Sequence, residues 1–255
     1  FALTGAPVDP GLDFTGGTEL RVAVDAPTDG AAQEQIRNAF GADPESIQSV
    51  PSDATYIVTF QESEASTSQL ESQAESAGFE ILSIDSVSAS FGQNTQFLAL
   101  GGVAVAFVGM SVVVFAMFRT FVPSVAVVVS AFSDIVIPVA LMNLLGIELS
   151  LGTVAALLML IGYSVDSDIL LNNHVLRRSG DFYESTYRAM RTGVTMTLTS
   201  LAAMLVMTLT ATLFGIGLLS SIGVILVFGL ATDLMNTYML NLSLLRWYKF
   251  EGVRR

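Results

Sequence analysis

The stretch Leu149-Ser-Leu-Gly-Thr-Val-Ala-Ala-Leu-Leu-Met-Leu-Ile-Gly-Tyr-Ser-Val-Asp-Ser-Asp-Ile-Leu-Leu171 contains two aspartates, Asp166 and Asp168, and no other charge. It is long enough to cross the hydrocarbon core of a bilayer as a helix. A charged side chain at membrane depth costs roughly 2.5–3.5 kcal/mol on insertion scales. Such carboxylates are retained in membrane helices when they pair with another group or take part in moving another group across the membrane. The stretch therefore predicts a membrane helix that also carries function.

The rest of the chain divides into an acidic part and an apolar part. Overall, 52% of the residues are hydrophobic and 13% are charged. Residues 1–95 hold fifteen Asp and Glu against two Arg, whereas long apolar runs separated by short polar loops follow. We therefore predict a domain outside the bilayer at 1–95 and a transmembrane domain at 96–255. The five predicted spans are 97–118, 121–145, 149–171, 192–214 and 216–247.

The acidic part has the pattern of a small α+β domain. Short alternating segments predict four strands, and two polar segments between them predict helices. Their order, β-α-β-β-α-β, is the ferredoxin-like order. The predicted strands are 18–24, 46–51, 54–60 and 79–87, and the predicted helices are 30–40 and 67–77.

Basic residues in alternate loops predict the orientation of the spans. Lys and Arg lie between the first and second spans, between the third and fourth, and at the end of the chain, while the other two loops have none. We expect a cell-membrane protein with several spans, a cytoplasmic C-terminus and an external domain at 1–95. An external domain before a span that runs inward also predicts a first transmembrane helix upstream of Phe1.

Several functional classes do not fit the composition. The chain has no cysteine and one histidine, His174, so thiolate and histidine-rich metal sites are excluded. The net charge of −12 opposes binding to nucleic acid. No Ser-His-Asp arrangement or nucleotide-binding loop is present, and we expect neither an enzyme nor a cofactor. The acidic, lysine-poor domain instead suggests an organism that lives in high salt.

Four motifs resemble the SecD and SecF protein-export membrane proteins. Gly11-Leu-Asp-Phe-Thr-Gly-Gly17 resembles the signature after that family's first span, and the segment 146–164 is similar to the fourth span of the SecF branch. Ser133-Asp134 takes the place of a His-Asp pair in the third span. Arg191-Thr192, followed by Thr195 and Thr199, resembles the start of the fifth. The small external domain favours the SecF branch over SecD.

The resemblance implies both a fold and a function. The fold is an α-helical polytopic bundle like that of resistance-nodulation-division transporters, with a small external ferredoxin-like domain. Family members work with SecD beside the SecY translocon, promote late steps in the translocation of exported polypeptides, and draw on the transmembrane ion gradient. The sequence does not distinguish H⁺ from Na⁺.

The two aspartates depart from the bacterial pattern. Bacterial SecF proteins have Leu-Asn-Asp-Thr where this chain has Val165-Asp-Ser-Asp168, which indicates a divergent, archaeal member. Residues two apart on a helix point about 200° apart. Because Asp166 matches the SecD-type position, we predict that it faces inward as the functional carboxylate, with Asp168 as its partner. The alternative is that both are hydrated at the membrane interface.

The other candidate residues support this site. Asp134 lies mid-span, so it is either paired with a hydroxyl of a neighbouring helix or part of a relay with Asp166. Arg191 is either a cation that pairs with Asp166 or Asp168, or an arginine that reaches the membrane surface. The supporting polar residues are Ser164, Thr192, Thr195, Thr199 and Asp233, and the motif or hinge residues are Gly11, Asp13, Gly16 and Gly17.

Two details of that set remain open. The threonine stripe serves helix packing or lines a water path, and Asp233 completes the site or contacts SecD. Two other functions are also compatible with the sequence. One is a structural or assembly subunit that moves no ion. The other is a small-molecule exporter of the wider transporter superfamily, which the small external domain argues against.

Overall fold

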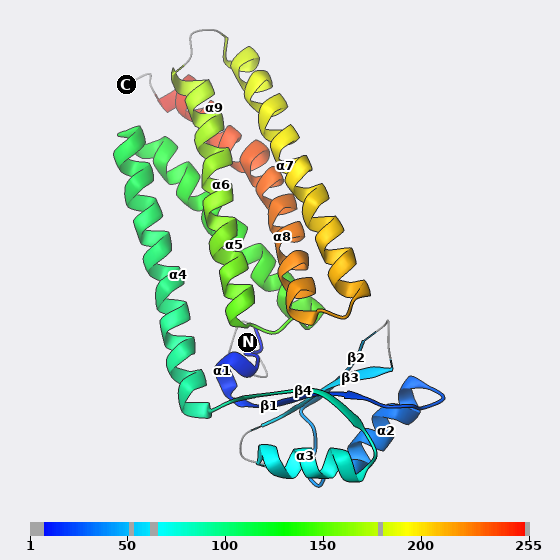
Figure 1. Ribbon diagram of the computed structural model, residues 1–255. Coiled ribbons are helices and arrows are strands. Elements are labelled where there is room, and N and C mark those ends of the chain that lie inside the picture. Colours follow the sequence, from blue (N-terminus) through cyan, green and yellow to red (C-terminus); the bar gives the residue numbers. More distant parts are fainter. Residues whose placement is uncertain (1–7, 51–53, 62–65, 178–180, 253–255) are drawn as a thin grey trace.

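The chain forms a small sheet domain at one end of a bundle of long helices (Figure 1). The computed structural model describes residues 8–50, 54–61, 66–177 and 181–252. The described part of the chain contains five helices that are long and apolar enough to cross a membrane. This architecture agrees with the predicted fold class.

The sheet domain has the predicted β-α-β-β-α-β order. Its antiparallel sheet has the strand order β2-β3-β1-β4, with β1 and β3 in the middle. The elements are β1 (Gly17–Ala23), α2 (Asp29–Ala39), β2 (Ser46–Val50), β3 (Thr55–Phe60), α3 (Thr67–Ser76) and β4 (Glu80–Val87).

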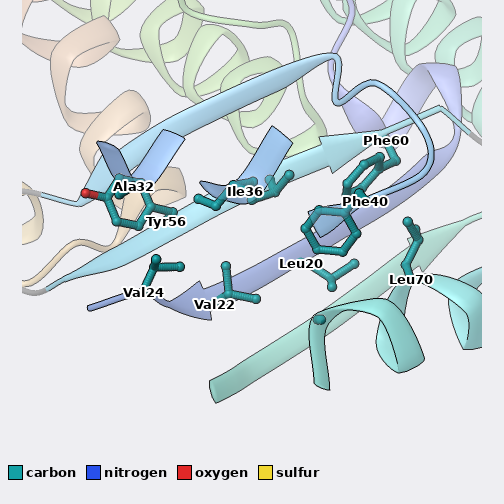
Figure 2. Packing of buried hydrophobic residues seen from close by; sticks show 11 residues of the cluster. Leu20, Val22, Val24, Ala32, Ile36, Phe40, Tyr56, Phe60 and Leu70 are labelled. Atoms are coloured by element: carbon teal, nitrogen blue, oxygen red, sulfur yellow. The ribbon is translucent and has the colours of Figure 1, made fainter. Parts of the chain in front are cut away.

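Alternation along the two central strands builds the core of this domain (Figure 2). Leu20 and Val22 of β1 lie beside Val58 and Phe60 of β3, and all four are fully buried. Helices α2 and α3 each add residues four apart, which lie on one helix face. These are Ala32 with Ile36 and Leu70 with Ala74.

The helix bundle begins directly after β4. Helix α4 starts at Ala89 rather than at 97, and α7 starts at Phe182 rather than at 192, so both begin before the predicted spans. The helices are α4 (Ala89–Phe118), α5 (Phe121–Leu145), α6 (Leu151–Arg177), α7 (Phe182–Leu213) and α8 (Gly217–Met235).

The last run departs from α-helical winding. After α8 come η1 (Asn236–Asn241), α9 (Leu242–Trp247) and η2 (Tyr248–Gly252), of which η1 and η2 are π-helical. Short π segments inside helices are rare and are frequent at functional sites. The segment η1 follows Asp233 within one turn of helix.

Several contacts between described residues join the sheet domain to the bundle. Pro10 pairs with Leu149 as a parallel bridge, and the N–H of Gly11 donates to the Leu149 carbonyl at 2.8 Å. On the other side, the Arg21 guanidinium donates to the carbonyl of Gly215, which lies between α7 and α8. The short helix α1 (Leu12–Thr15) packs against α4.

Candidate functional site: a buried carboxylate cluster

Three aspartates from three helices meet inside the bundle. Asp134 lies on α5, Asp168 on α6 and Asp233 on α8, and each is 0% exposed. We call these three residues the carboxylate cluster. Burying a charge is costly unless partners compensate it, so the groups around the cluster determine what it can do.

Neutral donors surround Asp134. The Ser164 hydroxyl donates to its Oδ2 at 2.5 Å, and the Asn236 amide donates to its Oδ1 at 2.7 Å. Pairing of Asp134 with a hydroxyl of a neighbouring helix was one of its two predicted roles, and Ser164 provides that pairing.

Asp168 and Asp233 share a second set of donors. Asn241 donates to Asp168 Oδ1 at 2.7 Å, and Thr237 donates to the same oxygen at 3.0 Å. The Ser167 hydroxyl lies 2.9 Å from Asp233 Oδ1 and 3.2 Å from its Oδ2. Ser167 and Thr237 are themselves 3.3 Å apart. Asp168 and Asp233 therefore belong to one hydrogen-bonded network.

No Lys or Arg forms an ion pair with the cluster in the described part of the chain. The ion pair found there joins Arg188 to Glu184 on the outside of α7 at 3.2 Å. Hydroxyl and amide donors leave the formal charge of a carboxylate uncompensated. Full ionisation of all three aspartates would therefore place three negative charges in a low-dielectric interior. A proton or a small cation is the natural means of neutralising them.

The structure corrects the predicted orientation of the two aspartates. Asp168 is fully buried, whereas Asp166 is exposed on the outer face of α6. The buried face of α6 repeats every four residues, and Asp166 falls about 200° from its neighbours in that repeat. The fully buried residues of the repeat are Ala156, Leu160, Ser164, Asp168 and Asn172.

Arg191 and the threonine stripe also lie outside the cluster. Arg191, Thr192, Thr195 and Thr199 are exposed on α7, and each threonine hydroxyl donates to a carbonyl of its own helix. The predicted ion pair between Arg191 and Asp166 or Asp168 is absent from the described part of the chain. The reason is the position of α7, which presents the other face to the bundle, where Thr197 accepts from the Tyr163 hydroxyl at 3.2 Å.

Two donors from the last run, Thr237 and Asn241, were not among the predicted site residues. Asn236, Thr237 and Asn241 all come from η1 and reach carboxylates on two other helices. In an α-helix, residues 236 and 241 would point about 140° apart. The i→i+5 winding of a π segment brings residues five apart close to one face. The polar residues were visible in the sequence, but their common direction depends on this winding.

The Gly11–Gly17 motif forms a clamp at the other end of α6. Asp13 accepts a hydrogen bond from the backbone N–H of Leu151 at 2.9 Å. Gly16 has φ +76°, and a Cβ there would lie 2.5 Å from the Ala89 nitrogen, so only glycine fits. Gly17 starts β1. The motif thus fixes both the sheet domain and the start of the helix that carries Asp168. Whether it also serves as a hinge stays a prediction.

A like-charged pair lies on the sheet beside this clamp. Glu19 of β1 is paired directly with Asp85 of β4. Burial raises the pKa of Glu19, and the charge of Asp85 raises it further, while Arg21 acts in the opposite direction. Like charges opposite each other across two strands are destabilising.

Comparison with known proteins shows the family. The family profile described as "Protein export membrane protein SecD/SecF, C-terminal" matches residues 67–251, and the "SecD/SecF GG Motif" profile matches residues 1–28. The chain belongs to the SecD/SecF protein-export family. The carboxylate cluster lies within the first match, and the Gly11–Gly17 motif lies within the second.

Two similar relatives of this SecD/SecF chain come from haloarchaea. The protein-export membrane protein SecF of Haloferax volcanii is 75% identical over 255 residues, which cover 100% of this chain and 87% of the relative. SecF of Haloquadratum walsbyi is 70% identical over 258 residues, with the same coverage. The predicted family, and its predicted archaeal and halophilic character, are confirmed. The match also favours protein export over small-molecule export.

A solved structure shares the fold of this SecD/SecF chain. SecDF from Thermus thermophilus, described as a translocon-associated membrane protein, matches with a TM-score of 0.74 and 20% sequence identity. The match covers 94% of this chain and 34% of that one, so the chain spans about a third of the solved SecDF protein. This similarity supports the transporter-like bundle with its small domain.

Proposed function

We propose that this protein is an accessory subunit of the Sec protein-export machinery. It works beside SecD and the SecY translocon and uses the transmembrane ion gradient to promote late steps of polypeptide translocation. The family assignment supports the export role. The observation that supports ion use is the carboxylate cluster, in which three fully buried aspartates from α5, α6 and α8 meet only neutral donors among the described residues.

In this proposal Asp168 is the principal ion-coupled carboxylate, with Asp134 and Asp233 in support. Binding or loss of a cation changes the charge that Asn241 and Thr237 stabilise at Asp168, and so changes how tightly η1 is held to α6. One charge that crosses 100 mV releases about 2.3 kcal/mol, which is enough to bias an element with two similar states.

Helix α6 offers a mechanical connection between the cluster and the sheet domain. Its first residue is held by Asp13, and its buried face carries Ser164 and Asp168. A shift of α6 relative to α5 and α8 would therefore move the clamp. We propose that the sheet domain lies on the external side, that the C-terminus is cytoplasmic, and that the movement acts on the exported polypeptide.

The exposed face of α7 and Asp166 are the proposed contact with SecD. Arg191, Thr192, Thr195 and Thr199 present a polar stripe on an apolar helix, which is costly against lipid and suits a protein partner. In this proposal Arg191 contacts SecD across the interface between the two subunits.

The decisive experiment compares Asp168→Asn with Asp166→Asn in vesicles that contain SecD and the translocon. Asparagine can still accept the hydrogen bonds from Asn241 and Thr237, so the fold is retained. Asp168→Asn should abolish the gradient-dependent part of export while copurification with SecD persists. Asp166→Asn, at the proposed contact with SecD, should weaken copurification with SecD but leave the gradient dependence of the remaining export intact. Wild-type export by Asp168→Asn would refute the assignment.

A further inference from the structure

Several buried polar atoms around Asp168 have no hydrogen-bond partner. The atoms are Ser130 Oγ, Asp168 Oδ2, Asn241 Oδ1, and both Oδ1 and Nδ2 of Asn172. All four residues are 0% exposed. An unsatisfied buried polar group destabilises the folded state, and native proteins contain only a few of them. A concentration of them beside one carboxylate points to a ligand.

The four residues are brought together by three elements. Asn241, at the end of η1, donates its amide to Asp168 Oδ1, which fixes the amide group and leaves its own Oδ1 unpartnered. Asn172 lies one turn beyond Asp168 on the same buried face of α6. Ser130 of α5 lies beside the Asp168 carboxyl group without meeting hydrogen-bond geometry.

The chemistry of these atoms fits a monovalent cation. They provide four oxygens, of which one belongs to a carboxylate and three to neutral groups, and hard cations prefer oxygen ligands. A proton on Asp168 would supply a single donor and leave most of the four oxygens unsatisfied. A divalent ion is disfavoured, because the described residues contain no group of three or more His, Cys, Asp or Glu placed to hold a metal ion.

We propose that an alkali-metal cation binds at Asp168 Oδ2, with Ser130 Oγ, Asn172 Oδ1 and Asn241 Oδ1 as its neutral ligands. This inference rests on the proposed function and names its coupling ion. Asn241 has a double role, since one atom of its amide holds the carboxylate while the other binds the cation. Loss of the cation would then loosen η1 from α6.

The test is thermal unfolding of the full-length protein in detergent, with NaCl replaced stepwise by choline chloride at constant ionic strength. A ligand that binds the folded state raises the melting temperature in a concentration-dependent way. The wild type should melt at a higher temperature in Na⁺ than in choline. Asn172→Leu should lose this response, with an apparent Na⁺ affinity at least about tenfold weaker.

The same variant separates a cation site from ordinary packing. If Asn172 is only a buried group without a ligand, leucine should raise the melting temperature in both salts, because it removes unsatisfied atoms. If Asn172 binds Na⁺, leucine should lower stability in Na⁺ alone. Asn173→Leu, which makes the same change one position along α6, should keep the Na⁺ response. Ser130→Ala, a smaller change with the same expected loss, replaces Asn172→Leu if that variant does not fold.

If the wild type has the same melting temperature in Na⁺ and in choline, the inference is wrong, and the site binds water instead of a cation. That result is distinct from failure of the proposed function. Export could still respond to a proton gradient and to Asp168→Asn, in which case only the identity of the ion would be wrong.

Discussion

The Asp13 carboxylate accepts a hydrogen bond from the backbone N–H of Leu151, the first residue of α6, at 2.9 Å. A carboxylate in this position satisfies one of the free N–H groups of a helix start and interacts favourably with the helix dipole. Because Asp13 belongs to the segment before β1, this bond ties the sheet domain to the helix that carries Asp168.

Replacing Asp13 with alanine should loosen the start of α6. Losing a side-chain cap costs about 0.5–2 kcal/mol, so hydrogen exchange at the Leu151 amide should rise by about twofold to thirtyfold. Asp9→Ala is the matched control, because Asp9 contributes its backbone carbonyl to the Leu149 N–H contact. Equal exchange in the two variants would show that the Asp13 carboxylate does not hold the helix.

A disulfide between positions 10 and 149 should lock the sheet domain to the bundle. Pro10 and Leu149 are partners in a parallel bridge, and the chain has no cysteine of its own. Neighbouring backbones of this kind bring Cα atoms within the range that a disulfide can span. Pro10→Cys with Leu149→Cys should form the crosslink on oxidation and keep export stimulation, because the proposed movement passes from α6 to the sheet domain through this clamp. Loss of stimulation on oxidation, restored by a reductant, would mean that the clamp must open.

Gly229 should tolerate no side chain. A Cβ at this position of α8 would lie 2.3 Å from Cδ2 of Leu160 on α6, where the helices pack closely. Gly229→Ala should therefore cost about 1–3 kcal/mol in thermal unfolding. At Gly109, on the exposed face of α4, no atom lies within 4 Å of such a Cβ, and Gly109→Ala should be neutral or stabilise by about 0.4–1 kcal/mol. The two variants should therefore differ in their change of stability. A similar change in both would contradict the close packing of Gly229 against Leu160.

The sequence predicted the elements much better than the directions of polar side chains. Alternation at Leu20, Val22, Val58 and Phe60 was enough to predict the sheet, since a strand has only two faces. Spacing placed Asp166 and Asp168 on different faces of α6 but did not tell which face was inward. The four-residue repeat Ser164, Asp168, Asn172 contained that information, because it forms a polar stripe that Asp166 does not share.

The remaining differences come from long-range packing. Arg191 was expected at the start of a span, but α7 begins at Phe182, so Arg191 lies on the side of a continuous helix. Its direction is set by contacts between α7 and α8 that no local pattern contains. The π winding of η1 likewise accompanies bonds from its Asn and Thr side chains to two carboxylates distant in sequence, Asp134 and Asp168.

The acidic sheet domain should lose stability when salt is removed. Residues 1–95 hold fifteen acidic residues against two arginines, and their repulsion grows as screening falls. Hydrogen exchange in β1 and β4 of the intact protein should increase as molar salt is diluted to millimolar. Exchange in α7, which contributes no residue to the carboxylate cluster or to the proposed cation site, provides the internal reference. Unchanged protection of β1 in dilute buffer would argue against adaptation to high salt.

The pair of Glu19 and Asp85 should make the sheet domain more stable as the pH falls below neutral. Burial, and then Asp85, raise the pKa of Glu19 in the folded state above its ordinary value of 4.5, so folding favours the protonated form. The ionised form of Glu19 at pH 7 therefore lowers the folding stability of the sheet domain. This loss of stability is relieved as the pH falls through the raised pKa towards 4.5. Glu19→Gln should remove the penalty, so β1 and β4 should exchange more slowly at pH 7 and show a flatter pH dependence. Glu71→Gln on the exposed face of α3 is the matched control. If both variants kept the wild-type pH dependence, Glu19 would not be the group responsible.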